Sequence, residues 1–306
     1  IFEPTFIEKE LNPSQRQAVI KALNSENIGL IQGPPGTGKT KVIKEIIGQV
    51  IRRAIKTADS PRILIVSQSH TAVDNILEGL DKTISDDLEI VRIGADKNVS
   101  PKILTRYTMP AHRDMLFESV KSNIEAYDHK KEKILKEIND QREHERWEKI
   151  KGIQKDWIER SVEKDCLDYQ VIRSATVIAG TCIGFLANSF VKDMEFDYVI
   201  IDEAAKATTP ELLVSIIKAK KIILVGDQNQ LPAFADERIS PMIAKLTKNP
   251  EFRMFDILFE SLPKSHKEVL STQYRMIENI GNLISTVFYN GTIDTGCKEK
   301  DKLHGL

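Results

Sequence analysis

One eight-residue segment constrains this chain more than any other. Residues 33–40 read GPPGTGKT, which fits the pattern GxxxxGK[ST]. An apolar run over residues 27–32 precedes the segment and a helical pattern over residues 39–54 follows it. This is the strand–loop–helix context in which glycines let backbone N–H groups turn toward phosphate oxygens at a helix N-terminus. The segment therefore predicts a nucleotide-binding loop.

The residue types within the loop indicate separate roles. We expect Lys39 to reach the β- and γ-phosphates and the Thr40 hydroxyl to bind Mg²⁺. The expected nucleotide-binding positions of the loop are Gly33, Pro34, Pro35, Gly36, Thr37, Gly38, Lys39 and Thr40.

Apolar runs that alternate with helical patterns predict the fold class. The runs are rich in Ile, Val and Leu and lack strict alternation, which is typical of strands buried on both faces. Helical patterns, for example over residues 39–54 and 71–80, lie between several of them. This order predicts an α/β fold with a doubly wound parallel sheet. The predicted strands are residues 27–32, 62–69, 89–94, 176–180, 198–202 and 221–226.

Two acidic residues end one of these strands. Residues 196–201, FDYVII, lead directly into Asp202 and Glu203. Ligands of open α/β sheets bind at the carboxyl ends of the strands, so both carboxylates are expected to face the phosphate loop. Asp202 suits Mg²⁺ because a hard cation prefers oxygen ligands, and Glu203 suits the base that orients an attacking water. This pair favours hydrolysis over transfer of the phosphoryl group to a metabolite.

Composition limits the remaining classes. The 306 residues carry 44 Lys and Arg against 45 Asp and Glu, and 41% of them are apolar. Such a chain can bury a sizeable core, and its length alone suggests about two domains. Disordered and disulfide-stapled classes are excluded, and no run reaches the roughly 18 apolar residues of a membrane span, so no membrane is expected as a partner. The near-zero charge argues against attraction of the whole molecule to nucleic acid but leaves a local basic groove open.

The cysteines and the first residues bear on location. Cys166, Cys182 and Cys297 include no CxxC pair, so neither a disulfide framework nor a metal cluster is expected. Reduced thiols predict an intracellular, cytoplasmic protein, or a nuclear one in a eukaryote. Residues 1–4, IFEP, are neither a signal peptide nor a natural initiator, which predicts that the chain is a fragment.

A highly charged segment separates the two halves of the motif set. Residues 121–165 contain 12 acidic and 12 basic residues, and their apolar residues recur at helical spacing. This pattern predicts two long amphipathic helices with a break near Asn139 and Asp140. Two interpretations remain open: a solvated insertion that packs on itself through Trp147 and Trp157, or a surface that touches a strand or a partner.

Five further motifs point to one family. They are residues 11–19 (LNPSQRQAV), 67–75 (SQSHTAVDN), 180–184 (GTCIG), 225–232 (VGDQNQLP) and 270–276 (LSTQYRM). Together with the loop, they resemble superfamily 1 helicases of the 5′→3′ group, which includes the up-frameshift RNA-decay helicase and senataxin. The resemblance implies an ATP-dependent helicase or translocase with a RecA-like P-loop domain. It also implies ATP and Mg²⁺ as cofactors and single-stranded RNA or DNA as a partner.

The resemblance also implies roles for individual residues. Gln15 would hydrogen-bond the adenine edge, Tyr274 would stack on the adenine face, and Gln230 would sense the γ-phosphate. Arg275 would neutralise charge in the transition state, so the implied catalytic set is Lys39, Glu203, Gln230 and Arg275. The implied contacts to the nucleic-acid backbone are Ser69, His70, Thr71, Asn75, Thr181 and Cys182. Without the family, both of these backbone-contacting segments are capped strand-to-helix turns.

The resemblance divides the chain into three parts. Residues 1–101 form the first part of a RecA-like domain, residues 102–170 a helical insertion, and residues 171–306 the second part with the start of a second RecA-like domain. The later motifs of that second domain are absent from the chain, so weak hydrolysis is expected from this piece alone. Two alternatives remain open: a stand-alone nucleotide-binding regulatory module, or a P-loop ATPase that is not a helicase. No motif distinguishes RNA from DNA.

Overall fold

The computed structural model of the chain describes residues 2–80, 88–95, 99–138, 141–161, 164–231 and 253–296. Three sequence features therefore lie outside the described residues. They are the predicted helix break at Asn139 and Asp140, Pro232 at the end of the 225–232 motif, and the last ten positions of the chain, which include Cys297.

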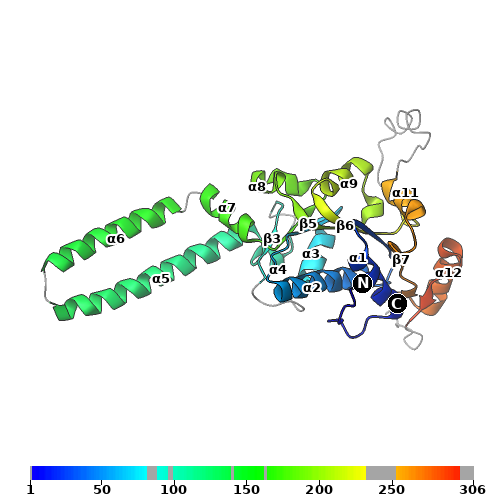
Figure 1. The fold of residues 1–306 in the computed structure, drawn as a ribbon, viewed down its shortest axis with the longest axis horizontal. Helices are drawn as coiled ribbons and strands as arrows, with labels where there is room; N and C mark the ends of the chain where they lie inside the picture. Colours follow the sequence, from blue (N-terminus) through cyan, green and yellow to red (C-terminus); the bar gives the residue numbers. More distant parts are fainter. Residues whose placement is uncertain are drawn as a thin grey trace, which may run out of the picture.

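A seven-stranded parallel sheet forms the centre of the molecule (Figure 1). Its order is β3-β4-β2-β5-β6-β1-β7, and every neighbouring pair runs parallel. The strands are β1 (Ile28–Gln32), β2 (Ile63–Ser67), β3 (Ile90–Arg92), β4 (Val177–Thr181), β5 (Phe196–Asp202), β6 (Ala219–Gly226) and β7 (Lys267–Val269). The predicted α/β class with a parallel sheet is confirmed.

All six predicted runs form strands, and β7 is the strand of this sheet that the sequence prediction missed. Its three residues, KEV, are short and charged at two positions, so they lack the apolar run that identifies the others. β7 forms because it pairs at the sheet edge with β1, where Leu30 is in register with Lys267 and Gln32 with Val269.

The sheet separates two hydrophobic cores, because successive side chains of a strand point to opposite faces. On β2, for example, Ile63 and Ile65 belong to one core while Leu64 and Val66 belong to the other. Helices α1 (Pro13–Asn24), α2 (Lys39–Thr57), α3 (His70–Leu80) and α4 (Pro101–Leu104) supply buried residues to the first core. Helices α7 (Lys164–Ser174), α8 (Ser189–Lys192), α9 (Thr209–Ile216) and α11 (Met254–Ser261) supply them to the second.

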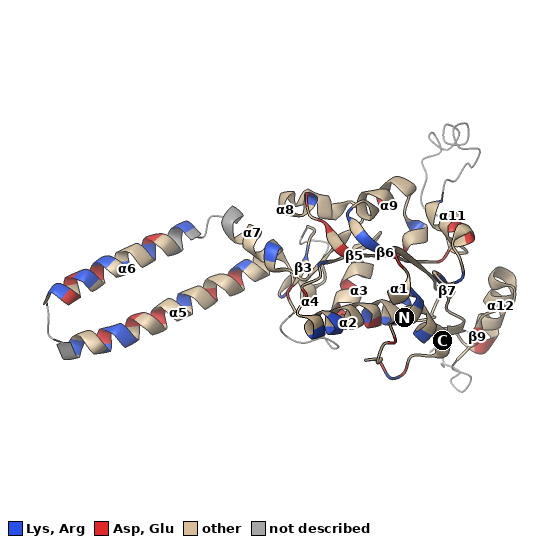
Figure 2. Cartoon of the chain, viewed as in Figure 1, with Lys and Arg blue, Asp and Glu red and all other residues tan. Residues whose placement is uncertain are grey.

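Two long helices project from the sheet as a hairpin (Figure 1). They are α5 (Met109–Ile138) and α6 (Gln141–Ser161), and both carry Lys, Arg, Asp and Glu along their length (Figure 2). Trp147 is buried against Tyr127, with ring centroids 5.7 Å apart, and Lys151 Nζ donates to Glu132 Oε1 at 2.9 Å. Trp157 is 54% exposed, so only one of the two tryptophans packs inside the hairpin. The pair of helices is confirmed, and the division of the chain into three parts stays a prediction.

The C-terminal part of the described chain adds a small unit beside β7. Strands β8 (Thr272–Gln273) and β9 (Asp294–Thr295) pair in parallel, and α12 (Glu278–Tyr289) connects them. Within the described ranges, no helix has an apolar stretch long enough to cross a bilayer.

Candidate functional site

The phosphate loop connects β1 to α2, in the strand–loop–helix order that the sequence predicts. Gly36 and Gly38 have φ angles of +77° and +84°, which L residues with a side chain rarely adopt. Lys39 folds back over the loop, and its Nζ donates to the Gly33 carbonyl at 2.6 Å. A Cβ atom on Gly33 would lie 2.2 Å from the Lys39 Cγ, so only glycine lets the lysine take this position.

Lys39 lies among charges of both signs. Burial lowers the pKa of its ammonium group, the nearby Asp202 and Asp227 oppose that shift, and Lys206 and Arg275 add to it. These five charged side chains come from α2, from the ends of β5 and β6, from the η3 turn (Ala204–Lys206) and from the segment after β8. The structure therefore brings Lys39, Asp202 and Arg275 of the predicted site together.

Gln15 lies directly behind the loop. Its Nε2 donates to the Thr37 carbonyl at 2.9 Å, and its Oε1 accepts from the backbone N–H of Asn12 at 3.0 Å. The Asn12 side chain accepts from the Gln15 N–H in return, which is a capping box at the start of α1. Gln15 thus ties the first helix to the phosphate loop, while its predicted contact with adenine stays a prediction.

The two carboxylates after β5 differ in their surroundings. Asp202 is 5% exposed, and burial raises the pKa of its carboxyl group to about 6. Its Oδ1 accepts from the backbone N–H of Glu203 at 2.9 Å. Glu203 has a φ angle of +53°, a conformation that costs a non-glycine residue energy and that clusters at functional sites. Its Oε1 accepts from Lys206 Nζ at 2.9 Å, so the predicted base is held in an ion pair.

The donor set suits a magnesium ion. Thr40, the second residue of α2, is half-buried, and Asp202 lies close enough to Lys39 for their charges to interact. A hydroxyl and a carboxylate are oxygen ligands, which Mg²⁺ prefers, and a buried carboxylate with a raised pKa gains most from a nearby cation. Thr40 and Asp202 are thus the residues that fit the ion.

Asp227 is the polar centre that sequence reasoning missed. It is 4% exposed, and its carboxylate accepts hydrogen bonds from Gln32 Nε2 (3.3 Å), Gln230 Nε2 (2.8 Å) and the Tyr289 hydroxyl (2.5 Å). The available sequence signal was the Gly-Asp turn at the end of β6, within the motif that supplied Gln230. Tyr289 lies 62 positions away in α12, and nothing in its local sequence links it to Asp227.

The segment after β8 lies against the loop. The backbone N–H of Tyr274 donates to the Gly36 carbonyl at 2.9 Å, and the Tyr274 hydroxyl accepts from Asn12 Nδ2 at 2.9 Å. A Cβ atom on Gly36 would lie 2.6 Å from the Arg275 Cβ, so the close approach of this segment requires glycine at that position. Tyr274 is 40% exposed and Arg275 is exposed, which leaves both side chains free to meet a ligand.

The predicted strand-binding residues lie at the same edge of the sheet, over β2, β3 and β4. Ser69 Oγ accepts from the Ala72 N–H at 3.1 Å at the start of α3, and Thr181 Oγ1 accepts from the Gly184 N–H at 3.1 Å. Both segments are thus capped turns, as the residues alone indicate. Thr71 and Asn75 are exposed. Cys182 is 2% exposed, and burial raises the pKa of its thiol to about 12, so a contact from this position would go through the backbone.

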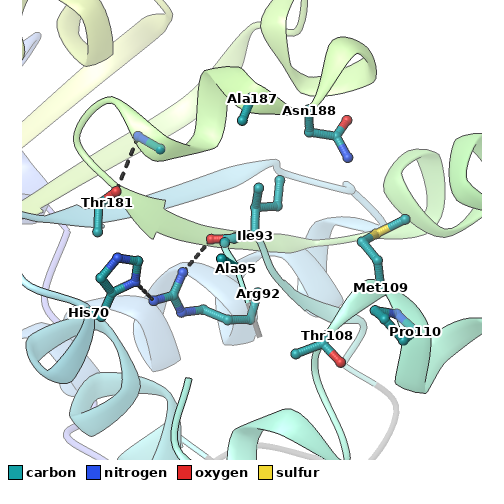
Figure 3. Close-up of a pocket in the computed structure, with 12 residues that line it drawn as sticks. His70, Arg92, Ile93, Ala95, Thr108, Met109, Pro110, Thr181, Ala187 and Asn188 are labelled. Carbon is teal, nitrogen blue, oxygen red and sulfur yellow. Dashed lines mark hydrogen bonds between the residues drawn. The ribbon is translucent and has the colours of Figure 1, made fainter. Parts of the chain in front are cut away.

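A surface pocket of about 500 Å³ opens beside these turns (Figure 3). His70 and Thr181 lie at one side of it, and Met109 and Pro110 at the start of α5 lie at the other. Arg92, at the end of β3, points from the floor toward His70, and its Nη2 lies 3.0 Å from the His70 Nδ1. Arg92 and Met109 were not predicted as site residues, because β3 carries no motif and the start of α5 lies in the charged insertion.

The parallel sheet, the phosphate loop and the two buried aspartates define a P-loop nucleotide-binding domain. A family model described as an AAA domain matches residues 10–237, and a second model with the same description matches residues 251–305. The chain belongs to this AAA-domain family.

Three relatives indicate the branch. An ATP-dependent helicase of Methanocaldococcus jannaschii is 31% identical over 326 residues, covering 94% of this chain and 46% of its own length. The DNA polymerase alpha-associated DNA helicase A of Schizosaccharomyces pombe is 32% identical and covers 97% of this chain and 42% of its own length. The ATP-dependent helicase upf1 of the same yeast is 28% identical and covers 96% of this chain and 29% of its own length.

These matches confirm the resemblance to superfamily 1 helicases of the up-frameshift type and the RecA-like fold. In each case the chain spans less than half of the relative's length.

Proposed function

We propose that this chain is the nucleotide- and strand-binding core of an ATP-dependent helicase or translocase. One observation carries the proposal: the phosphate loop, Asp202, Glu203 and the Asp227–Gln230 pair converge at one edge of the sheet, beside the capped turns over β2 and β4. In this arrangement, a change at the γ-phosphate is transmitted over a short distance to a bound strand. The relatives named above as ATP-dependent and DNA helicases support the same assignment.

The nucleotide chemistry follows from the groups that surround Lys39. Lys39 leaves the Gly33 carbonyl and binds the β- and γ-phosphates, and Glu203 releases Lys206 to orient the attacking water. Thr40 and Asp202 would hold Mg²⁺. When bound, Mg²⁺ neutralises charge that develops on the phosphate oxygens. The Gln230 side chain exchanges its hydrogen bond with Asp227 for one with the γ-phosphate. The delocalised positive charge of the Arg275 guanidinium group stabilises the transition state.

A second RecA-like domain completes the site in this proposal. The exposed face of α12 supports it, because several large apolar side chains of this helix point outward although Tyr289 is buried. Gly281 and Ser285 are buried, while Leu283, Val287 and Phe288 are 64%, 60% and 57% exposed. A soluble domain rarely exposes such a stripe without a partner. Since the chain covers under half of its relatives, the rest of a longer protein is the natural occupant.

Single-stranded RNA or DNA is the proposed partner. The turns at Ser69 and Thr181 bring hydroxyl groups and helix N-terminal N–H groups to one surface, which suits the phosphates of a strand and carries no base information. Movement in the 5′→3′ direction, and an intracellular location, are proposed from the resemblance alone.

The test measures ATP hydrolysis and unwinding by the chain and by the same chain extended with the sequence that follows Leu306 in its gene. We expect oligonucleotide-stimulated hydrolysis that rises at least about tenfold on extension, because a second arginine and domain closure then act on the γ-phosphate. Matched RNA and DNA duplexes with 5′ or 3′ tails determine the substrate and the direction. Lys39→Ala in both forms controls for contaminating ATPases.

Three outcomes would contradict the proposal. Nucleotide binding without any strand-stimulated hydrolysis in the extended chain would indicate a regulatory module. A rate of ATP hydrolysis that does not change when oligonucleotide is added at about 50 mM salt, where phosphate contacts are strong, would indicate a P-loop ATPase of another class. Full activity in the chain as it stands would remove the need for a second domain.

A further inference from the structure

A buried arginine, Arg92, lies behind the turn at His70, which is proposed to contact the nucleic-acid strand. The Arg92 side chain is 0% exposed, and its Nε donates to Asp74 Oδ1 at 2.8 Å. Its Nη1 donates to the Ile93 carbonyl, and its Nη2 lies 3.0 Å from His70 Nδ1 (Figure 3). All three nitrogens of the guanidinium group thus have contacts inside the protein.

The contact with His70 has only one consistent assignment of protons. A guanidinium group donates hydrogen bonds and has no acceptor. His70 Nδ1 must therefore accept, which requires its lone pair. A neutral imidazole with an unprotonated Nδ1 carries its proton on Nε2, so the contact fixes both the charge and the tautomer of the ring.

A chain of hydrogen bonds holds the arginine in this position. Asp74 Oδ2 accepts from the backbone N–H of Ser100 at 2.8 Å, and the Ser100 hydroxyl donates to Glu78 Oε1 at 2.9 Å. Both Asp74 oxygens are thus occupied, and the carboxylate cannot rotate away from Arg92. This fixed pair leaves His70 as the flexible end of the network, at the wall of the pocket.

The pocket presents few other polar groups to the ring. The charged groups that face His70 are Arg92 on β3 and Asp74 on α3. The other polar side chains that line the pocket are Thr108, Thr181 and Asn188, and none of them titrates. Among the described residues, no hydrogen bond is made by His70 Nε2, while Nδ1 is occupied.

We propose that Arg92 is a positioning residue that holds His70 as the neutral Nε2–H tautomer, so that His70 donates one hydrogen bond to an oxygen of the sugar-phosphate backbone in this pocket. The proposal rests on the strand binding proposed above. Its consequence is specific: the turn contacts the strand through a neutral donor, and the positive charge of Arg92 serves only to select the tautomer.

The electrostatics of the ring agree with this geometry. Partial burial and the charge of Arg92 lower the pKa of His70, and the more distant Asp74 opposes the shift. A histidine in this state stays neutral where ordinary histidines become charged, near pH 6.5. We therefore expect the contribution of His70 to strand affinity to change only at a lower pH than that of an ordinary histidine would.

Nitrogen-15 NMR of the histidine-labelled chain tests the tautomer directly. We expect the His70 ring, identified by its absence in His70→Gln, to show a protonated Nε2 and an unprotonated Nδ1 at neutral pH. The double variant Arg92→Met with Asp74→Asn removes both buried charges together, so that neither is left unpaired. In this variant His70 should titrate near its ordinary pKa of about 6.5.

Binding of a labelled oligonucleotide tests the donor. His70→Phe keeps a ring but removes the N–H, and should raise the Kd roughly three- to tenfold, the effect of one hydrogen bond. His70→Gln places an N–H near the Nε2 position and should restore most of the affinity. The double variant should bind more tightly as pH falls from about 7.5 to 5.5, because an imidazolium then attracts the phosphates. Arg146→Gln, on exposed α6, is the matched control for loss of an arginine.

The outcomes separate this proposal from the proposed function. A proton on Nδ1, or titration of His70 together with the exposed histidines, overturns the tautomer assignment whether or not the chain binds a strand. Equal affinities of His70→Phe and His70→Gln overturn the donor role. An unsubstituted chain that binds no oligonucleotide at low salt contradicts the proposed function, and the binding half of this proposal fails with it.

Discussion

At the scale of single residues, the site keeps charged groups where water is scarce. Burial lowers the pKa of Lys39 and raises that of Asp202, and the attraction between the two side chains offsets only part of each shift. Such a pair stabilises the fold weakly, since desolvation offsets most of the attraction. It is prepared instead for a ligand that carries charges of both signs, such as a phosphate chain with its metal ion.

Asp202→Asn should therefore stabilise the fold while it removes the metal ligand. The pKa of Asp202 is about 6 in the folded chain and lies near 3.8 when exposed, so the folded state binds the proton more tightly. This contribution to stability is complete below about pH 4 and is lost as pH rises through about 6. At pH 7.5 we expect Asp202→Asn to be more stable by roughly 1–3 kcal/mol, and at pH 4 to equal the unsubstituted chain.

Thermal unfolding at the two pH values measures this difference, with exposed Asp193→Asn as the control. ATP hydrolysis by the extended chain should be lost in Asp202→Asn. If Asp202→Asn is less stable than the unsubstituted chain at pH 7.5, the attraction of the carboxylate to its charged neighbours outweighs the cost of burying its charge.

Single residues also show the limits of sequence reasoning. Asp202 was predictable because its role follows from its place at the end of an apolar run. Asp227 and Tyr289 were not, because their contact joins positions 62 residues apart and depends on where α12 packs. The burial of Cys182 was equally hidden, since a cysteine in a turn can face either the core or the solvent.

At the scale of elements, α12 is attached to the nucleotide site by polar contacts near its C-terminal end. Asn229 Nδ2 donates to the Phe288 carbonyl at 3.0 Å. The Tyr289 hydroxyl donates to the buried Asp227 carboxylate, which also binds Gln230, the predicted sensor of the γ-phosphate. Burial and this hydrogen bond both raise the pKa of Tyr289, so the hydroxyl keeps its proton at any physiological pH. The contact thus links the helix to the group that is proposed to respond to hydrolysis.

Tyr289→Phe should loosen this link. A hydrogen bond to a charged, buried acceptor contributes about 1.5–3 kcal/mol, and we expect a loss of that size in the free energy of unfolding. Chemical denaturation measures it, with Tyr127→Phe on the exposed hairpin as a matched control that should change stability by less than about 0.5 kcal/mol. Equal effects of the two variants would mean that Asp227 finds another donor.

The hairpin of α5 and α6 is an element that packs mainly on itself. Its contacts beyond the base, such as Tyr127 with Trp147 and Glu132 with Lys151, join one helix to the other. The helical period and charge pattern of the sequence therefore predicted both helices, because their formation depends on neighbours in the same segment. β7 was missed for the opposite reason, since only its pairing with β1 makes it a strand.

Replacing residues 124–158 with a short Gly-Ser linker should leave the core folded. The cut lies beyond the Arg113–Asp168 ion pair (3.3 Å), which joins the base of α5 to α7. We expect the free energy of unfolding and the free energy of ATP binding each to change by less than about 1 kcal/mol. Arg113→Ala, which breaks the ion pair at the base of the hairpin, is the comparison variant. A large loss of oligonucleotide affinity with intact stability would show that the hairpin touches the strand.

At the scale of the whole molecule, the described chain has two hydrophobic cores that helices cover and an apolar face that the described residues leave exposed. Both sides of the parallel sheet are covered, as the near-continuous apolar strands predict. The uncovered face is the outer side of α12, with Leu283 and Phe288 among its most exposed residues. The sequence pattern of α12 is amphipathic in the ordinary way, and only the structure shows that the apolar side faces outward.

Leu283→Ala together with Phe288→Ala should therefore have different effects in two forms of the protein. In the chain as it stands, both side chains are already in water, and we expect a change in the free energy of unfolding within about 0.5 kcal/mol. In the chain extended past Leu306, the proposed second domain buries them, and each substitution should cost about 2–5 kcal/mol. Phe255→Ala, in the buried core, should be costly in both forms. Small effects of the double variant in both forms would mean that the extension does not cover this face of α12. The nucleotide site would then need another partner to supply the second arginine.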